Sequence, residues 1–160
     1  MSEIIKGFDP LFDENSIVLI LGSFPSVKSR AVDFYYGNRQ NKFWDMLYGY
    51  FGEKADVEID KRRNFLLQKR IAVWDIVTAC EIEGSSDASI RNFQIADLSV
   101  VFNVAKIESV LLNGAVSYKI FCSRYSNCGI AYERMPSTSP ANVRWDLSSW
   151  YRELDRVFGR

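Results

Sequence analysis

The chain contains no histidine, and its three cysteines, Cys80, Cys122 and Cys128, do not form a repeated pair. A structural zinc site and a four-cysteine iron–sulfur cluster are therefore excluded, and we expect no metal site. Without histidine, neither the Ser-His-Asp nor the Cys-His route to nucleophilic catalysis is available. Any enzyme made from this sequence must use carboxylates, amides, hydroxyls or positioned water.

The sequence also lacks an excess of either charge, since 20 Lys and Arg residues balance 20 Asp and Glu residues. No global field draws such a protein onto nucleic acid, so any contact with DNA must be local and come from a few loops. No apolar run approaches the roughly 20 residues of a membrane span, and residues 1–9 lack the pattern of a signal peptide. We therefore expect a cytoplasmic protein without membrane contact, and a monomer, because no exposed apolar stripe is evident.

At 160 residues, the chain suits a single domain, residues 1–160, with a sizeable core. Apolar runs predict four buried strands, at Ser16–Leu21, Ile71–Val77, Ile107–Leu112 and Ile130–Met135. Helical spacing of apolar residues predicts helices at Asn41–Phe51, Asp60–Lys69, Ala96–Ala105, Ala115–Tyr125 and Leu147–Phe158. Strands separated by such helices predict an α/β fold with three layers, in which helices cover both faces of a four-stranded parallel sheet.

In parallel sheets of this kind, ligands bind beyond the carboxyl ends of the strands. The segments that follow the four predicted strands are rich in glycine, proline or small polar residues; they are Gly22–Ser26, Asp75–Ala79, Asn113–Gly114 and Pro136–Asn142. This coincidence is the first indication of a functional site.

The segment Leu21–Ser29 (LGSFPSVKS) leaves the first strand through Gly22, which lets a ligand approach the backbone closely. Its hydroxyls suit a phosphate, although neither a P-loop nor a dinucleotide-binding glycine pattern is present. A plain strand-to-helix turn explains the segment equally well.

The segment Phe34–Trp44 (FYYGNRQNKFW) places aromatic residues and asparagines together before a helix. An aromatic ring such as Tyr36 in a loop suits stacking on a flat heterocycle, worth about 1–3 kcal/mol per base. The amides of Asn38 and Asn41 suit a base edge or a water molecule. The alternative is a surface loop with helix-capping asparagines.

Two further segments are open to a structural and a functional interpretation. Met135–Asn142 (MPSTSPAN) holds its hydroxyls between prolines, which stiffen a loop for phosphate contact, and Arg144 adds a charge. Asn113 is either a turn residue before Gly114 or a base-reading amide. For Asp87 in the polar insertion Gly84–Arg91, we expect a cap on a following helix-like stretch rather than a substrate contact.

Taken together, these segments resemble the uracil-DNA glycosylase superfamily, and within it the hypoxanthine-DNA glycosylase branch. The resemblance spans nearly the whole chain and rests on five segments in one order: Leu21–Ser26 (LGSFPS), Tyr35–Trp44 (YYGNRQNKFW), Val73–Asn92, Leu111–Gly114 (LLNG) and Met135–Asn142. It implies a four-stranded parallel sheet flanked by helices, and an enzyme that flips a damaged nucleotide out of double-stranded DNA and hydrolyses its N-glycosidic bond. It also implies that no cofactor is needed.

The resemblance assigns site residues by position. Related mismatch-specific enzymes have a water-positioning amide or carboxylate where this chain has Phe24, so the catalytic amide falls on Asn41, with Asn38 as its rival because the chain lacks the expected His-Pro after Gly37. The resemblance implies base contacts from Gly22, Ser23, Phe24, Tyr36 and Asn113. It implies DNA contacts from Pro25, Ser26, Ser137, Thr138, Ser139, Pro140, Ala141, Asn142 and Arg144.

Three other functions remain open at this stage. The first is a glycosylase specific for uracil or thymine mismatches, which Phe24 disfavours. The second is a DNA- or nucleotide-binding module without catalytic activity, since a fold alone does not specify a function. The third is a flavodoxin-like domain, whose flavin would suit the aromatic loop but which needs a better phosphate-binding first turn.

Overall fold

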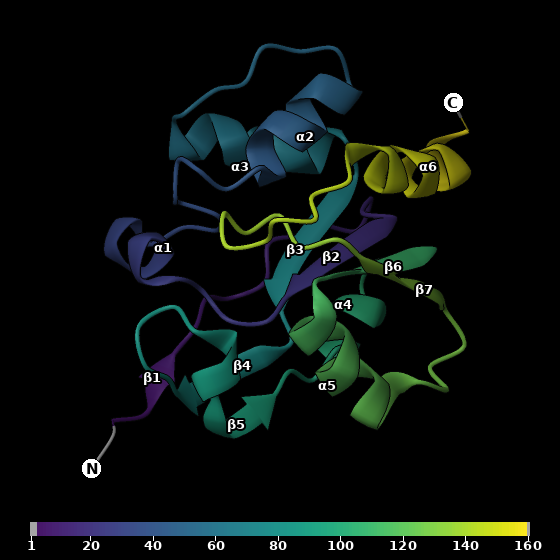
Figure 1. The fold of residues 1–160 in the computed structure, drawn as a ribbon. Coiled ribbons are helices and arrows are strands. Elements are labelled where there is room, and N and C mark those ends of the chain that lie inside the picture. Colours follow the sequence, from purple (N-terminus) through teal and green to yellow (C-terminus); the bar gives the residue numbers. More distant parts are fainter. Residues whose placement is uncertain (1–2, 160) are drawn as a thin grey trace.

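The computed structural model of the protein describes residues 3–159 and contains two sheets (Figure 1). The larger sheet has four parallel strands in the order β3-β2-β6-β7, with bounds β2 Val18–Gly22, β3 Ile71–Asp75, β6 Ser109–Asn113 and β7 Ala131–Met135. The smaller sheet has the order β1-β4-β5, with β1 Ile5–Lys6, β4 Val77–Glu81 and β5 Arg91–Ile95, and both of its pairings are antiparallel.

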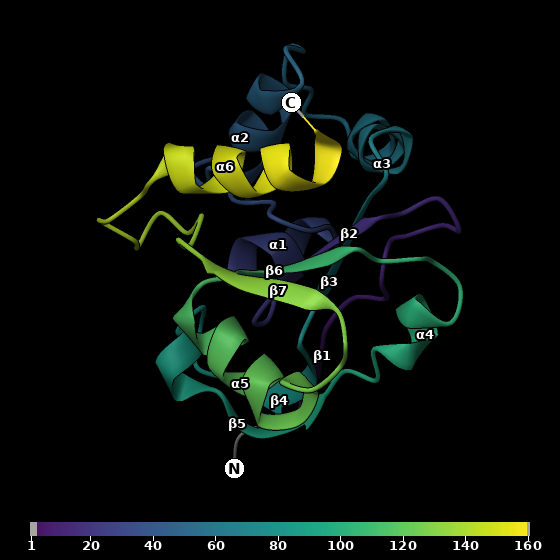
Figure 2. The same ribbon diagram turned by 90° about the vertical axis from the view of Figure 1, so that its right-hand side faces the viewer.

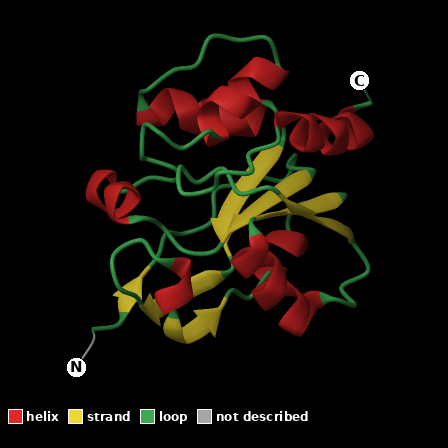
Figure 3. Ribbon diagram, in the orientation of Figure 1, coloured by secondary structure: helices red, strands yellow, loops and turns green. Residues whose placement is uncertain are grey.

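The helices cover both faces of the parallel sheet (Figures 2 and 3). Their bounds are α1 Val27–Val32, α2 Phe43–Tyr50, α3 Ile59–Gln68, α4 Ser99–Phe102, α5 Ala115–Tyr125 and α6 Leu147–Phe158. In Figure 2, α2, α3 and α6 lie on one side of the sheet, and α4, α5 and the smaller sheet lie on the other. The three-layer α/β/α fold predicted from the sequence is therefore confirmed.

The sequences of the strands explain their places in the sheet. Every residue of β2, β3 and β6 is buried, as expected for strands covered on both faces, whose sequences read as continuous apolar runs. The edge strand β7 is mostly exposed and carries the charged residues Glu133 and Arg134. No helix within residues 3–159 combines the length and the apolar character needed to cross a bilayer.

The run Ile71–Val77, predicted as one strand, is two strands in different sheets. β3 ends at Asp75, and the N–H groups of Ile76 and Val77 donate to the carbonyls of Gly22 (2.8 Å) and Ser23 (3.1 Å). The chain then pairs with β1 and β5 as β4. A continuous apolar run is compatible with burial in either sheet, so only the pairing partners reveal the switch.

Two other sequence predictions are wrong in this region. The helix predicted at Ala96–Ala105 is confined to α4, because the N–H of Ala96 still donates to Ile76 O (2.8 Å) and the chain there is extended. The helix-like stretch predicted after Asp87 is the strand β5, and Asp87 itself is the first residue of a short 3-10 helix, Asp87–Ser89, whose N-cap is Ser86.

Candidate active site

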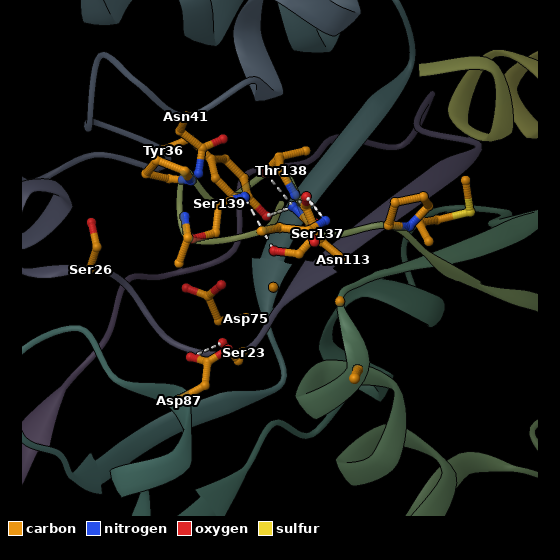
Figure 4. Close-up of a pocket in the computed structure, with 18 of the residues that line it drawn as sticks. Ser23, Ser26, Tyr36, Asn41, Asp75, Asp87, Asn113, Ser137, Thr138 and Ser139 are labelled. Atoms are coloured by element: carbon orange, nitrogen blue, oxygen red, sulfur yellow. Dashed lines mark hydrogen bonds between the residues drawn. The ribbon is translucent and has the colours of Figure 1, made fainter. Parts of the chain in front are cut away.

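The four parallel strands end at one edge of the sheet, where they form an open cleft of about 940 Å³ (Figure 4). The register pairs Gly22 with Asp75, and Asn113 with Met135, so the last residues of neighbouring strands lie side by side. All the site residues predicted from the sequence line this cleft. The structure therefore brings together segments that lie more than 100 residues apart in the chain.

Tyr36 is held rigidly in the wall of the cleft. Its ring stacks on Phe43, with the ring centroids 3.9 Å apart and the planes 18° apart, and its carbonyl accepts a hydrogen bond from Trp44 Nε1 at 3.2 Å. Its backbone lies in the left-handed region (φ 52°), which is uncommon for a residue other than glycine and is often found at functional sites. One face of the ring is covered by Phe43, so a ligand can stack only on the other.

Asn113, at the end of β6, joins the strand to the loop that follows β7. Its Nδ2 donates to Thr138 Oγ1 (2.9 Å) and to Tyr36 Oη (3.2 Å), and its Oδ1 accepts from the backbone N–H of Thr138 (3.0 Å). Both residues of the Asn113–Thr138 pair are buried. The Asn113 amide therefore orients the loop and the Tyr36 ring in this structure.

Asn41 and Asn38 both fold their side chains onto nearby backbone. Asn41 Oδ1 accepts from the N–H of Phe43 (2.9 Å) at the start of α2, and Asn38 Oδ1 accepts from the N–H of Gln40 (3.0 Å). The next residue after Asn41, Lys42, donates its backbone N–H to Thr138 O at 3.0 Å. A carbonyl oxygen has two lone pairs, so the bond to Phe43 leaves the Asn41 oxygen able to accept a second donor.

The turn after β2 is covered, and its two serines are held by hydrogen bonds. Ser23 Oγ donates to Asp87 Oδ1 (2.7 Å), and Ser26 Oγ caps α1 by accepting from the N–H of Ser29 (3.1 Å). Phe24 and Pro25 are buried, although atoms of both reach the wall of the cleft. Asp87, for which we predicted a capping role, instead connects the 84–87 loop to this turn.

No family model matches the chain. A curated protein named hypoxanthine DNA glycosylase from Methanosarcina acetivorans is 36% identical over 148 residues, which cover 89% of this chain and 90% of that protein. A protein of the same name from Methanosarcina barkeri is 35% identical over 114 residues, or 70% of this chain and 72% of that protein. The chain belongs to the hypoxanthine DNA glycosylase family.

A solved structure resembles this family member over its whole length. The solution NMR structure of a proposed uracil DNA glycosylase from Methanosarcina acetivorans covers 99% of this chain and 100% of its own, with a TM-score of 0.85 and 31% sequence identity. The resemblance inferred from the five sequence segments is therefore confirmed, and so is the fold.

In this hypoxanthine DNA glycosylase family member, the loop after β7 is stiffened by its own hydrogen bonds. Ser137 Oγ accepts from the N–H of Ser139 (3.2 Å), and Asn142 Nδ2 donates to Ser137 O (2.9 Å). Trp150 of α6 donates its indole N–H to Pro136 O at 2.8 Å. The loop thus presents a fixed surface, and Val143 just beyond it is 95% exposed.

Three exposed arginines, Arg134, Arg144 and Arg152, line the rim of the cleft beside this loop. Of these three, only Arg144 was predicted from the sequence. Arg134 and Arg152 lie in β7 and α6, where nothing in the local sequence distinguishes them from other surface arginines. The three arginines place three positive charges in a lining that also contains the acidic residues Glu133 and Glu153.

Asp75, a buried carboxyl in the floor of the cleft, was not among the site residues predicted from the sequence. Burial, and next the charge of Asp87, raise the pKa of Asp75 to about 8. Desolvation also raises the pKa of Asp87, while the hydrogen bond from Ser23 opposes that shift. The available signal was a single acidic residue within the apolar run IAVWDIV, at the end of a predicted sheet strand.

Proposed function

We propose that this DNA glycosylase removes hypoxanthine from deoxyinosine in double-stranded DNA, hydrolysing the N-glycosidic bond and leaving an abasic site. It acts as a cytoplasmic monomer, with residues 1–160 as one domain and without a metal or cofactor. Two relatives named hypoxanthine DNA glycosylase support the substrate, since one of them is 36% identical over nearly the full chain.

The observation that carries the proposal is the contact between the Asn41 segment and the loop after β7. The Lys42 N–H donates to Thr138 O at 3.0 Å, so the proposed catalytic amide lies beside the loop proposed to hold DNA. A nucleotide held by that loop and flipped from the duplex therefore enters the cleft next to Asn41.

In the proposed reaction, the flipped base stacks on the free face of Tyr36. Asn41 orients a water molecule toward the anomeric carbon, by the lone pair that the Phe43 N–H does not use. An amide is not a strong base, so its contribution is to position the nucleophile. The turn Gly22–Phe24 approaches the base closely, and its backbone N–H groups stabilise negative charge on the departing base. Both hydrogens of the Asn113 amide are already donated to Thr138 and Tyr36, so Asn113 contributes by holding the Tyr36 ring and the loop in place.

DNA contact in this proposal is local. Ser26, the loop residues 137–142 and Arg144 contact phosphates, with Arg134 and Arg152 adding charge at the rim. Val143, almost fully exposed beside this loop, is suited to fill the space vacated by the flipped nucleotide, as apolar side chains do when they enter a base step.

Uracil is the second candidate substrate, because the proposed uracil DNA glycosylase from Methanosarcina acetivorans shares this fold at 31% identity. Phe24 argues against uracil, because it occupies the position at which related mismatch-specific enzymes have a water-positioning amide. The Phe24 side chain is apolar, 7% exposed and packs toward Gly7, so this side chain offers no polar group to a pyrimidine or to water.

The test is a single-turnover reaction with labelled duplexes that contain deoxyinosine, deoxyuridine or undamaged bases, followed by alkaline cleavage at abasic sites. We expect strand breaks with deoxyinosine, and their loss in Asn41→Ala. Breaks mainly with deoxyuridine would replace the substrate and keep the enzyme class. Folded protein that cleaves none of these duplexes would refute the proposal.

A further inference from the structure

Asp75 carries the one buried side-chain oxygen or nitrogen in residues 3–159 that has no hydrogen-bond partner, its Oδ2. The residue is 5% exposed and lies in the floor of the cleft, where its carboxyl points toward the open space (Figure 4). Nearly all buried polar groups in proteins are paired, so an orphaned carboxyl aimed into a cleft indicates a ligand that completes it.

The backbone opposite Asp75 is shaped to leave room for this carboxyl. Gly22 is its partner in the β2–β3 register, and a Cβ at Gly22 would overlap Asp75 Oδ1 and lie 3.0 Å from Tyr36 Oη. Glycine is therefore required by a close approach, and the carboxyl, the bare backbone of Gly22 and the Tyr36 phenol meet at one point of the cleft.

The charges around Asp75 favour its neutral, proton-carrying form. The titratable groups that face it are Asp87 from the 3-10 helix and the phenols of Tyr36 and Tyr35 from the segment before α2. None of these groups is a cation that could stabilise the carboxylate. Burial and the charge of Asp87 raise the pKa of Asp75 to about 8, so at neutral pH the carboxyl is a hydrogen-bond donor and an acid.

We propose that Asp75 is a catalytic residue that donates its proton to N7 of the purine base as the base leaves. The inference rests on the proposed function, since it requires a purine substrate. The N9–C1′ bond breaks with its electron pair going to the base, and the proton of Asp75 goes to N7. Water adds its hydroxide to C1′, and its proton returns to the Asp75 carboxylate through solvent. The products are hypoxanthine and the abasic sugar.

The chemistry of the substrate explains why a neutral acid is needed. The N7 and O6 atoms of a 6-oxopurine lie on one edge, and both accept hydrogen bonds, so an ionised carboxylate would repel this edge and a neutral carboxyl can donate to it. General acid catalysis is most effective when the pKa of the acid lies near the working pH. Backbone N–H groups stabilise charge on the base but transfer no proton, so Asp75 complements them.

The experiment compares two variants on two substrates. Asp75→Asn keeps the size of the side chain but has no acidic proton, and Asp60→Asn on the exposed surface of α3 is the matched control for loss of one carboxylate. Single-turnover rates are measured on duplexes with deoxyinosine and with 7-deazadeoxyinosine, whose N7 is replaced by C–H, from pH 6 to pH 9.5.

We expect Asp75→Asn to lose at least about 100-fold on deoxyinosine, within the range of general acid catalysis, while Asp60→Asn stays near wild type. The wild type should slow on 7-deazadeoxyinosine by a similar factor, and Asp75→Asn should add no further loss there. The wild-type rate should also fall above about pH 8, and the variant should lack this fall.

Three results would overturn the inference, and they are distinguishable. Wild-type activity on deoxyinosine with Asp75→Asn unaffected removes Asp75 from the reaction. An equal loss on both substrates assigns it a positioning role instead. Wild-type cleavage of deoxyuridine alone, or of no duplex, overturns the proposed function and, with it, proton transfer to N7.

Discussion

Asn113 and Thr138 bind each other twice, through Asn113 Nδ2 to Thr138 Oγ1 at 2.9 Å and through the Thr138 N–H to Asn113 Oδ1 at 3.0 Å. This buried pair connects the end of β6 to the loop after β7, 25 residues later in the chain. The position of the loop after β7 therefore depends on a side chain at the end of a sheet strand.

The contributions of the two Asn113–Thr138 hydrogen bonds to stability should be separable by mutation. Thr138→Val removes one acceptor and should cost about 1 kcal/mol of stability, whereas Asn113→Ala also leaves the buried Thr138 N–H unpaired and should cost about 2–4 kcal/mol. Urea denaturation measures both. Equal costs for the two substitutions would contradict the double connection.

Gly22→Ala should lower stability by about 1–3 kcal/mol, because the added methyl overlaps Asp75 Oδ1 and the backbone cannot move without disturbing the sheet. In an Asp75→Ala background the same change should cost less, although the Tyr36 hydroxyl, 3.0 Å from the added Cβ, still crowds it. A double-mutant cycle in thermal unfolding measures the coupling. Additive costs would show that the two residues do not touch.

Asp75 should make stability depend on pH. Its folded pKa, about 8, lies above the value of about 3.9 expected for an unfolded Asp, so between these values the folded state holds a proton that the unfolded state lacks. Stability should therefore fall as pH rises from about 4 to about 8, by up to about 1.4 kcal/mol per pH unit, and level off above. The difference between wild type and Asp75→Asn in urea denaturation at pH 5, 6, 7 and 8 isolates this contribution. A difference that does not change with pH would mean that Asp75 is ionised in the folded protein.

Asn41 Oδ1 accepts from the Phe43 N–H and, in the proposed reaction, also holds the water molecule. Asn41→Asp should keep the hydrogen bond from Phe43 and the stability, whereas Asn41→Ala should lose about 1 kcal/mol. Asn41→Ala should also lose activity on deoxyinosine duplexes, whereas Asn41→Asp keeps an oxygen with a second lone pair for the water and should retain much more of it. Full activity in Asn41→Ala would transfer the role to Asn38, and Asn38→Ala is the companion variant.

The arginine rim predicts a salt-dependent DNA affinity. Arg144→Gln or Arg152→Gln should weaken binding to damaged and undamaged duplexes alike, and each should reduce the slope of log K against log salt by about 1. Fluorescence anisotropy at several salt concentrations measures the slope. Arg39→Gln serves as the control, because Arg39 is exposed but does not line the cleft.

Much of the fold was accessible from the sequence. The runs that became β2, β3 and β6 are apolar at nearly every position, because strands covered on both faces must be, and this is a local and readable signal. The rule that parallel strands present their carboxyl ends at one edge then placed Gly22, Asn113 and the loop after β7 in a common cleft. With this rule, the residue types in the sequence were sufficient to predict the common cleft.

Tertiary structure alone decided the parts that depend on partners distant in the chain. The switch between sheets at Ile76, the contact of Ser23 with Asp87 across 64 residues and the addition of Arg134 and Arg152 to the rim have no local pattern. The raised pKa of Asp75 likewise depends on partners that are distant in the chain. It arises because the fold buries the carboxyl beside Asp87 and leaves Oδ2 unpaired, and desolvation is set by what surrounds a group in space rather than by its neighbours in sequence.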